Sequence, residues 1–233
     1  MHFDSDYMNT CHPLVLQRML QTQGQQFAGY GADTISQSAR SKIRDLCQSP
    51  DAEVQFLCGG TQTNMVVIDF LLRSFEGVLA ADSAHISIHE SGAIEFTGHK
   101  VLPLPAKDGK ITAEQVDRYV RNYYSDPNWE HIVPPGMVYI THPTEYGTIY
   151  TLQELEDLSS VCRNHHIPLY IDGARLGYAI GAIPENEKLE IKNSQFSLPD
   201  LSDIARLCDA FYIGGTKCGA MFGEAIVIPR PKP

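Results

Sequence analysis

The segment IPLYIDGARLGYAIGA, residues 167–182, joins an apolar run that ends at Asp172 to an amphipathic run over residues 174–182. A short apolar run favours a buried strand, and the run after it has the spacing of a helix. A strand followed directly by a helix is the repeating unit of a parallel sheet, because the chain must cross back over the sheet before the next parallel strand begins. The segment therefore predicts an α/β fold.

The same succession of strand and helix recurs elsewhere in the chain. VQFLC (54–58) precedes QTNMVVIDFLLRSF (62–75), GMVYIT (136–141) precedes TLQELEDLSSVCRNHH (151–166), and DAFYIGG (209–215) closes the series. Strands separated by helical patterns imply crossover connections. We expect three layers, α/β/α, with a mainly parallel sheet in the middle.

Composition excludes several classes of function. The chain has 233 residues, with 18 basic and 28 acidic ones, a formal charge of −10 and no cluster of lysine and arginine. This balance argues against a nucleic acid or an anionic membrane as partner. The first ten residues do not resemble a signal peptide and no apolar run is as long as a membrane span, so we expect a soluble, cytoplasmic protein. Six cysteines without CxxC pairs suggest neither a zinc site nor disulfides.

Two polar clusters fall where strands of the sheet are expected to end, which is where ligands of such sheets bind. In CGGTQTN (58–64), glycines and Thr61 join a strand to a helix, where backbone N–H groups could hold a phosphate. A tight turn without a ligand is the alternative. In YIDGAR (170–175), Asp172 ends a strand and needs a cation or strong donors. Arg175 could be that cation, or a ligand's protonated ring nitrogen could serve instead.

A lysine follows the last strand of the series, in IGGTKCG (213–219). The amine of a lysine at a desolvated strand end has a depressed pKa and can attack a carbonyl to form a Schiff base. A lysine that simply reaches water is the alternative. The flanking Gly214, Gly215 and Gly219 favour a reactive Lys217, because they allow a bulky group to approach the backbone.

Three histidines are also candidates for chemistry. His85 and His89 in ADSAHISIHESG (81–92) have the i, i+4 spacing of a metal pair if the segment is helical, but no third ligand is identifiable. The alternatives are a solvated helix face for His89 and, for His85, stacking on an aromatic cofactor. His142 follows another expected strand, as a general base or a capping side chain.

A phosphate cradle, a carboxylate for a ring nitrogen, a reactive lysine and a stacking histidine are the parts that a pyridoxal phosphate site requires. The chain resembles the threonine aldolase and β-eliminating lyase family of pyridoxal phosphate enzymes, which has the aspartate-aminotransferase-type fold. The motifs that carry the resemblance extend from one end of the chain to the other, and the last two are the most specific. They are FDSDYMNTCHP (3–13), AGYGAD (28–33), GGTQTN (59–64), DSAHISIHESGA (82–93), THPTEYGTIYTLQEL (141–155), IDGARLGYA (171–179) and GGTKCGAMFGEAIVI (214–228).

The resemblance implies how pyridoxal 5'-phosphate is bound. Lys217 would form the Schiff base with the cofactor, and Asp172 would pair with its ring nitrogen. Gly60 and Thr61 would hold the phosphate, and His85 would stack on the ring.

The resemblance also implies the residues around the substrate. Arg175 would lie near the phenolic oxygen of the cofactor or the Schiff base, and Ser5 would help to place the substrate carboxylate. His142 matches the second active-site histidine of threonine aldolases, although many relatives have glutamine there. The general base is therefore open among His142, His85 and a water between them.

The implied reaction is the cleavage of a threonine-like β-hydroxy-α-amino acid to glycine and an aldehyde, in a homodimer or homotetramer. The alternatives are β-elimination from an amino acid, and an inactive fragment or scaffold of this fold. Members of the family continue into a smaller carboxy-terminal domain. We therefore expect residues 1–228 to form the large, cofactor-binding domain with its N-terminal segment, and residues 229–233 to begin a linker to a small domain that is missing here.

Overall fold

The computed structural model describes residues 5–182 and 197–231. Its centre is a seven-stranded sheet with the strand order β1-β7-β6-β5-β4-β2-β3. Neighbouring strands from β3 to β6 are parallel, whereas β7 runs antiparallel to both β6 and β1. The predicted mainly parallel sheet is confirmed. The strands are β1 (Glu53–Leu57), β2 (Gly77–Ala81), β3 (Val101–Leu104), β4 (Pro135–Thr141), β5 (Leu169–Asp172), β6 (Ala210–Gly214) and β7 (Glu224–Ile228).

The middle of the sheet is buried on both faces. Every residue of β4 and of β5 is buried, which explains why these strands are continuous apolar runs rather than alternating ones. Tyr139, Tyr170 and Tyr212 come from the neighbouring strands β4, β5 and β6, and all three are fully buried. Because buried hydroxyl groups need hydrogen-bond partners inside the protein, we expect polar side chains next to these tyrosines in the core.

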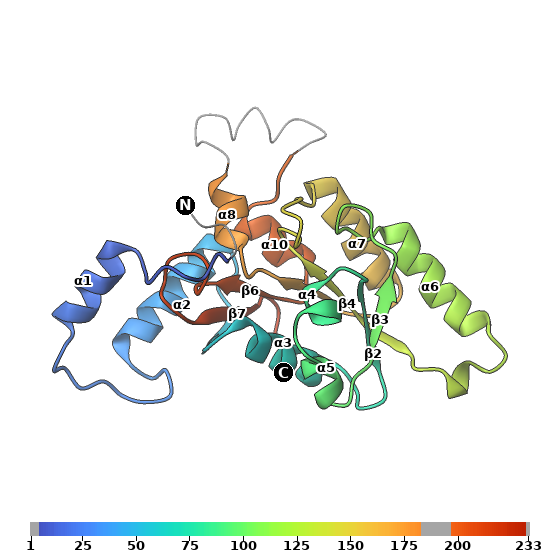
Figure 1. Cartoon of the computed structure of the whole chain (residues 1–233), viewed down its shortest axis with the longest axis horizontal. Coiled ribbons are helices and arrows are strands. Elements are labelled where there is room, and N and C mark those ends of the chain that lie inside the picture. Colours follow the sequence, from blue (N-terminus) through green and yellow to red (C-terminus); the bar gives the residue numbers. More distant parts are fainter. Residues whose placement is uncertain (1–4, 183–196, 232–233) are drawn as a thin grey trace.

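Helices cover both faces of the sheet. In Figure 1, α3 (Gly60–Leu71) lies on one side, and α7 (Leu152–Asn164) and α10 (Leu201–Leu207) lie on the other, with α6 (Ala113–Ser125) packed beside α7. The buried side chains of α3 are Thr63, Asn64, Val67 and Ile68, so one stripe of the helix faces the sheet. The predicted three-layer α/β architecture is confirmed.

The remaining helices lie at the periphery or are short. The first two, α1 (Pro13–Gln21) and α2 (Thr34–Leu46), lie on the left of Figure 1 and neither has a buried residue, although α2 contacts β1 through a hydrogen bond from Arg40 to the Val54 carbonyl. The short ones are α4 (His85–Ile88), α5 (Ala93–Phe96), α8 (Leu176–Gly181) and the 3-10 helix η1 (Trp129–His131). No helix in the described ranges has both the length and the apolar character that crossing a membrane requires.

The carboxyl ends of β5 and β6 approach each other closely. The N–H group of Gly214 donates to the carbonyl of Gly173 at 2.9 Å. A Cβ atom on Gly214 would lie 2.1 Å from the backbone oxygen of Ala174, and one on Gly173 would lie 2.0 Å from that of Tyr212. Glycine at both positions therefore allows the turn after β6, which carries Lys217, to lie beside the end of β5.

Residues after β7 are held against α10. The guanidinium of Arg230 donates to the carbonyl oxygens of Ala205, Arg206 and Cys208. The predicted linker begins here, and its last two residues, 232 and 233, lie outside the described residues. The division into a large domain and a linker stays a prediction.

Candidate active site

A cavity of about 380 Å³ opens at the carboxyl ends of β5 and β6. Five of the predicted site residues line it: Gly60, Thr61, His85, Asp172 and Lys217. They come from the start of α3, the start of α4, the end of β5 and the turn after β6. The fold thus brings together residues that are far apart in the sequence, and each role assigned to them stays a prediction.

Asp172 is a buried carboxylate with three hydrogen-bond donors. Its Oδ2 atom accepts from the Tyr139 hydroxyl at 2.6 Å and from Asn64 Nδ2 at 3.0 Å, and its Oδ1 atom accepts from the N–H of Ala174 at 2.9 Å. Burial and the negative charge of Asp172 raise the pKa of Tyr139 well above its usual value, so the phenol keeps the proton that it donates. Such donors stabilise the ionised form of a carboxylate, which is the form that binds a cation.

The turn that carries Lys217 is fixed by contacts on both sides. The Tyr178 hydroxyl donates to the carbonyl of Lys217 at 2.6 Å, and the N–H of Gly215 donates to Glu224 Oε2 at 2.9 Å. Glu224 is only 4% exposed, and burial raises its pKa. Lys217 is half-buried and lines the cavity together with Glu224, so its amine is held near carboxylates in a partly desolvated place.

The start of α3 forms another wall of the cavity. Gly59, the residue before the helix, makes no side-chain capping hydrogen bond. The N–H groups at an uncapped helix start are available to an anion, and the helix dipole favours negative charge there. A Cβ atom on Gly60 would lie 3.0 Å from the Tyr212 hydroxyl, so a larger residue would narrow the cavity. With the exposed hydroxyl of Thr61 nearby, this wall suits a phosphate group.

His85 is held by a buried carboxylate. Its Nδ1 atom lies 2.8 Å from Glu90 Oε1, and this hydrogen bond is the main reason why the pKa of His85 is raised. His89 also lines the cavity, and the two imidazole rings lie 5.4 Å apart. In the part of the chain that the structure describes, no group of three metal-ligating side chains comes together. Among the described residues, His85 and His89 therefore have no third side chain with which they could bind a metal ion.

Arg175 lies next to the cavity rather than in its lining. It lines a neighbouring cavity of about 370 Å³, and Glu145 lines both cavities. The Nε atom of Arg175 donates to Asp6, and its Nη1 atom lies 3.5 Å from Glu145 Oε2. Among the described residues, the carboxylates within ion-pair distance of Arg175 are Asp6 and Glu145, and Asp172 acts on it through its charge alone.

The remaining two predicted residues do not line the 380 Å³ cavity in the described structure. His142 is 1% exposed, and its Nδ1 atom accepts a hydrogen bond from the N–H of Tyr150 at 3.4 Å. Burial lowers the pKa of His142 to about 4, so the ring is neutral near pH 7. Ser5 accepts a hydrogen bond from the N–H of Tyr7, which does line the cavity. The roles of His142 and Ser5 stay predictions.

Several residues of the site were not predicted from the sequence: Asn64, Glu90, Tyr139, Glu145 and Glu224. A signal existed for three of them, because a polar residue inside or at the edge of an apolar run must find partners. Asn64 begins the apolar run of α3, Tyr139 lies within β4, and Glu224 begins the apolar strand β7. Glu90 and Glu145 lie in polar loops, where an acidic residue is not distinctive.

The fold is shared with known structures. An aminotransferase from Escherichia coli has a TM-score of 0.71 and 12% sequence identity, with 97% of this chain and 53% of that chain covered. The sheet and the cavity at its carboxyl edge therefore define an aminotransferase-like α/β protein.

The sequence comparisons give the family. The model of the β-eliminating lyases matches residues 3–232, and this chain belongs to that family. A low specificity L-threonine aldolase from Pseudomonas sp. (strain NCIMB 10558) is 32% identical over 203 residues, which are 85% of this chain and 53% of that protein. A structure of Leishmania major threonine aldolase has a TM-score of 0.86 at 43% identity, and covers 98% of this chain and 63% of that chain.

These findings confirm the family that the motifs predicted. Threonine aldolases and aminotransferase-type proteins are pyridoxal phosphate enzymes. The chain spans about half the length of the curated relatives it matches.

Proposed function

We propose that this chain carries the cofactor-binding part of a pyridoxal-phosphate-dependent aldehyde-lyase, which cleaves a β-hydroxy-α-amino acid such as threonine to glycine and an aldehyde. The observation that supports the proposal is that Lys217 and Asp172 line one cavity with an uncapped helix start. An amine, an ionised carboxylate and an anion site are the three attachments that this cofactor needs. The family and the similarity to threonine aldolases support the same reaction.

The residues present fit the cofactor. Asp172 is buried and bound by donors as an anion, so it can hold a protonated ring nitrogen. The start of α3 with Gly60 and Thr61 would hold the phosphate, and Lys217 would bind the aldehyde covalently. His85 would lie against the ring. The volume of about 380 Å³ is within the range of cavities that bind small molecules.

The bound cofactor would supply an electron sink for the electron pair released at the substrate's Cα atom. Asp172 keeps a proton on the ring nitrogen, because loss of that proton would leave a buried carboxylate without its cation. Lys217 supplies an amine that accepts and returns protons beside the reacting carbon. His85 has its Nδ1 atom bound to Glu90, which leaves Nε2 to exchange a proton with the substrate hydroxyl.

His142 serves this mechanism less directly. Its ring is neutral and does not line the cavity in the described structure, which supports our proposal that His85 is the histidine that contacts the substrate. General-base assistance is typically worth about 10²- to 10⁴-fold in rate. We expect loss of Lys217 to reduce the rate more than loss of either histidine.

Product analysis tests the proposed reaction. The purified chain is mixed with pyridoxal phosphate and threonine, and the products are identified. Glycine and acetaldehyde in equal amounts would support aldehyde-lyase activity. Ammonia and a keto acid as products would show that the chain catalyses β-elimination instead. Binding of the cofactor without any product, or no binding at all, would favour the scaffold alternative.

A further inference from the structure

Glu90 lies between two residues of the candidate site and belongs to neither wall of the cavity. It follows α4, and its side chain is fully buried. One oxygen, Oε1, lies 2.8 Å from His85 Nδ1 and accepts from Asn64 Nδ2 at 2.7 Å. The other oxygen, Oε2, is buried and has no hydrogen-bond partner among the described residues. A buried carboxylate that is only half satisfied is costly, so its position calls for an explanation.

Asn64 connects Glu90 to Asp172. Its amide nitrogen donates to Glu90 Oε1 and to Asp172 Oδ2, at 2.7 and 3.0 Å. Its carbonyl oxygen accepts from the Tyr170 hydroxyl at 2.9 Å, which fixes the orientation of the amide. The hydrogen bonds therefore run without a gap from His85 through Glu90 and Asn64 to Asp172. The two ends of this chain line the cavity, whereas its two middle members do not.

His85 is placed at the one end of this chain where a basic side chain meets a carboxylate. Glu90 has no lysine or arginine partner among the described residues, and the imidazole of His85 is its one basic partner there. The other groups that act on His85 are Glu145 and Asp172 through their charges, and His89 through its ring. A buried carboxylate is stabilised by hydrogen-bond donors, which His85 and Asn64 supply together to Glu90 Oε1.

We infer that Glu90 is a positioning residue that holds His85 through its Nδ1 atom and braces Asp172 through Asn64. The imidazole and the carboxylate that face the cavity are thereby set as one unit. The identity of the ligand that this unit binds rests on the proposed function. The hydrogen bonds that link His85, Glu90, Asn64 and Asp172 do not depend on it. Glu90 touches neither the cavity nor any reacting atom, so its effect is exerted through its two neighbours.

The linkage is tested first in the chain without cofactor, by NMR of protein with ¹⁵N-labelled histidine. His85 is assigned from the signal that His85→Asn removes. In the wild-type chain at high pH, the structure predicts that the proton of neutral His85 stays on Nδ1, where Glu90 accepts it. A proton on Nε2 would overturn the inference. This measurement needs no change at Glu90, so it stands even if variants there fold poorly.

The second measurement follows the titration of His85 in Glu90→Gln. Glutamine keeps an acceptor oxygen but removes the charge, so the midpoint should fall by about 1 to 3 pH units. Glu95→Gln is the matched control, because it removes the same charge from an exposed residue five positions further along, and the midpoint should not change. An unchanged midpoint in folded Glu90→Gln would contradict the inference.

The third measurement is the affinity for pyridoxal phosphate, followed by absorbance. Glu90→Gln should weaken binding roughly tenfold, because a buried partner of both site residues loses its charge. Equal affinity of Glu90→Gln and wild type would refute the bracing of Asp172. If wild type shows the predicted histidine behaviour but binds no pyridoxal phosphate, the proposed function fails and the linkage stands.

Discussion

Asp172 shows how a single residue is made ready for its role. Its backbone belongs to β5, and its side chain is 2% exposed with three donors around it. An isolated carboxylate in such a place would take up a proton. In Asp172, the donors Tyr139, Asn64 and the Ala174 N–H satisfy both carboxylate oxygens before any ligand arrives. The site is therefore preorganised for a cation rather than formed by one.

His142 allows a prediction about pH and stability. In the folded chain its pKa is about 4, whereas its ordinary value is 6.5. As the pH falls from 6.5, the unfolded chain therefore binds a proton that the folded chain does not, and stability is lost down to about pH 4. The loss due to this residue amounts to about 3 kcal/mol.

His142→Gln should remove this part of the pH dependence, since glutamine does not titrate but can still accept from Tyr150. Urea unfolding of wild type and variant at about pH 4.5 and 7.5 would measure it. His131→Gln, in an exposed position of η1, is the control and should behave like wild type. The same decrease in stability with falling pH in His142→Gln and wild type would contradict the burial of a neutral imidazole.

At the scale of elements, the close approach of β5 and β6 determines where Lys217 lies. Gly214→Ala would place a Cβ atom 2.1 Å from the Ala174 carbonyl oxygen, and the three nearest atoms are all backbone atoms of Ala174. Because backbone cannot move aside as a flexible side chain does, we expect a loss of roughly 1 to 3 kcal/mol in stability. The turn with Lys217 should move away from Asp172, and affinity for pyridoxal phosphate should fall.

Gly181→Ala on α8 is the matched control, because no atom of the described residues lies within 4 Å of its added Cβ atom. It should be neutral or slightly stabilising, since alanine favours a helix. Thermal unfolding and cofactor titration of both variants would measure the difference. Equal stability of Gly214→Ala and Gly181→Ala would show that the ends of β5 and β6 do not approach each other as closely as the structure indicates.

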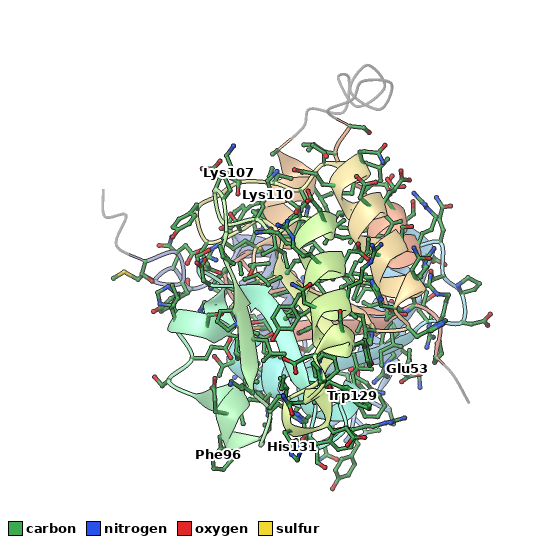
Figure 2. All side chains as sticks on the ribbon, turned by 90° about the vertical axis from the view of Figure 1, so that its right-hand side faces the viewer. Glu53, Phe96, Lys107, Lys110, Trp129 and His131 are labelled. Carbon is green, nitrogen blue, oxygen red and sulfur yellow. The ribbon has the colours of Figure 1, made fainter. Side chains whose placement is uncertain are left out.

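The loop that carries Glu145, a residue of the cavity lining, is held by a neighbouring turn. Lys107 and Lys110, which lie on one turn at the upper left of Figure 2, pair through their backbones. Lys110 forms an ion pair at 2.6 Å with Glu154, which also takes part in the capping box of α7. The Lys110 amine also donates to the Ile149 carbonyl, and the Thr148 hydroxyl donates to the Asp108 carbonyl, so this turn holds the end of the loop between β4 and α7.

Much of this arrangement could be predicted from the sequence, because apolar runs mark buried strands and ligands bind at their carboxyl ends. Asp172, Lys217 and Gly60 were found in this way. The direction of β7 could not be predicted, since an apolar run does not indicate whether its strand lies parallel or antiparallel to its neighbours. Glu90 was missed because its contact to Asn64 joins residues distant in the chain, and no local pattern records such a contact. His142 directly follows β4 as Asp172 ends β5, but its ring accepts a hydrogen bond from Tyr150 and does not line the cavity in the described structure.

At the scale of the whole molecule, α1 presents an apolar surface. Leu14, Leu16, Met19 and Leu20 are between 45% and 66% exposed, and no residue of the helix is buried. The N–H of His12, just before α1, donates to the carbonyl of Gly219 in the turn that carries Lys217. Apolar surface of this kind marks an interface, and we propose that a second copy of the chain covers it in a homo-oligomer.

Leu20→Glu tests this interface, because a charge there should not be buried against a partner. We expect the particle mass in solution, measured by light scattering after size-exclusion chromatography, to fall from that of an oligomer to that of one chain. Gln17→Glu adds a charge to the same helix at a position that is already polar and should leave the mass unchanged. A monomeric wild type, or an unchanged mass in Leu20→Glu, would count against the oligomer.

In the proposed function, the amine of Lys217 and the carboxylate of Asp172 face one bound cofactor. This is tested by reducing the chain with borohydride after mixing with pyridoxal phosphate and mapping its peptides by mass spectrometry. We expect one modified peptide, which contains Lys217, and loss of this product in Lys217→Ala but not in Lys42→Ala on α2. Modification spread over exposed lysines, or none at Lys217, would contradict it.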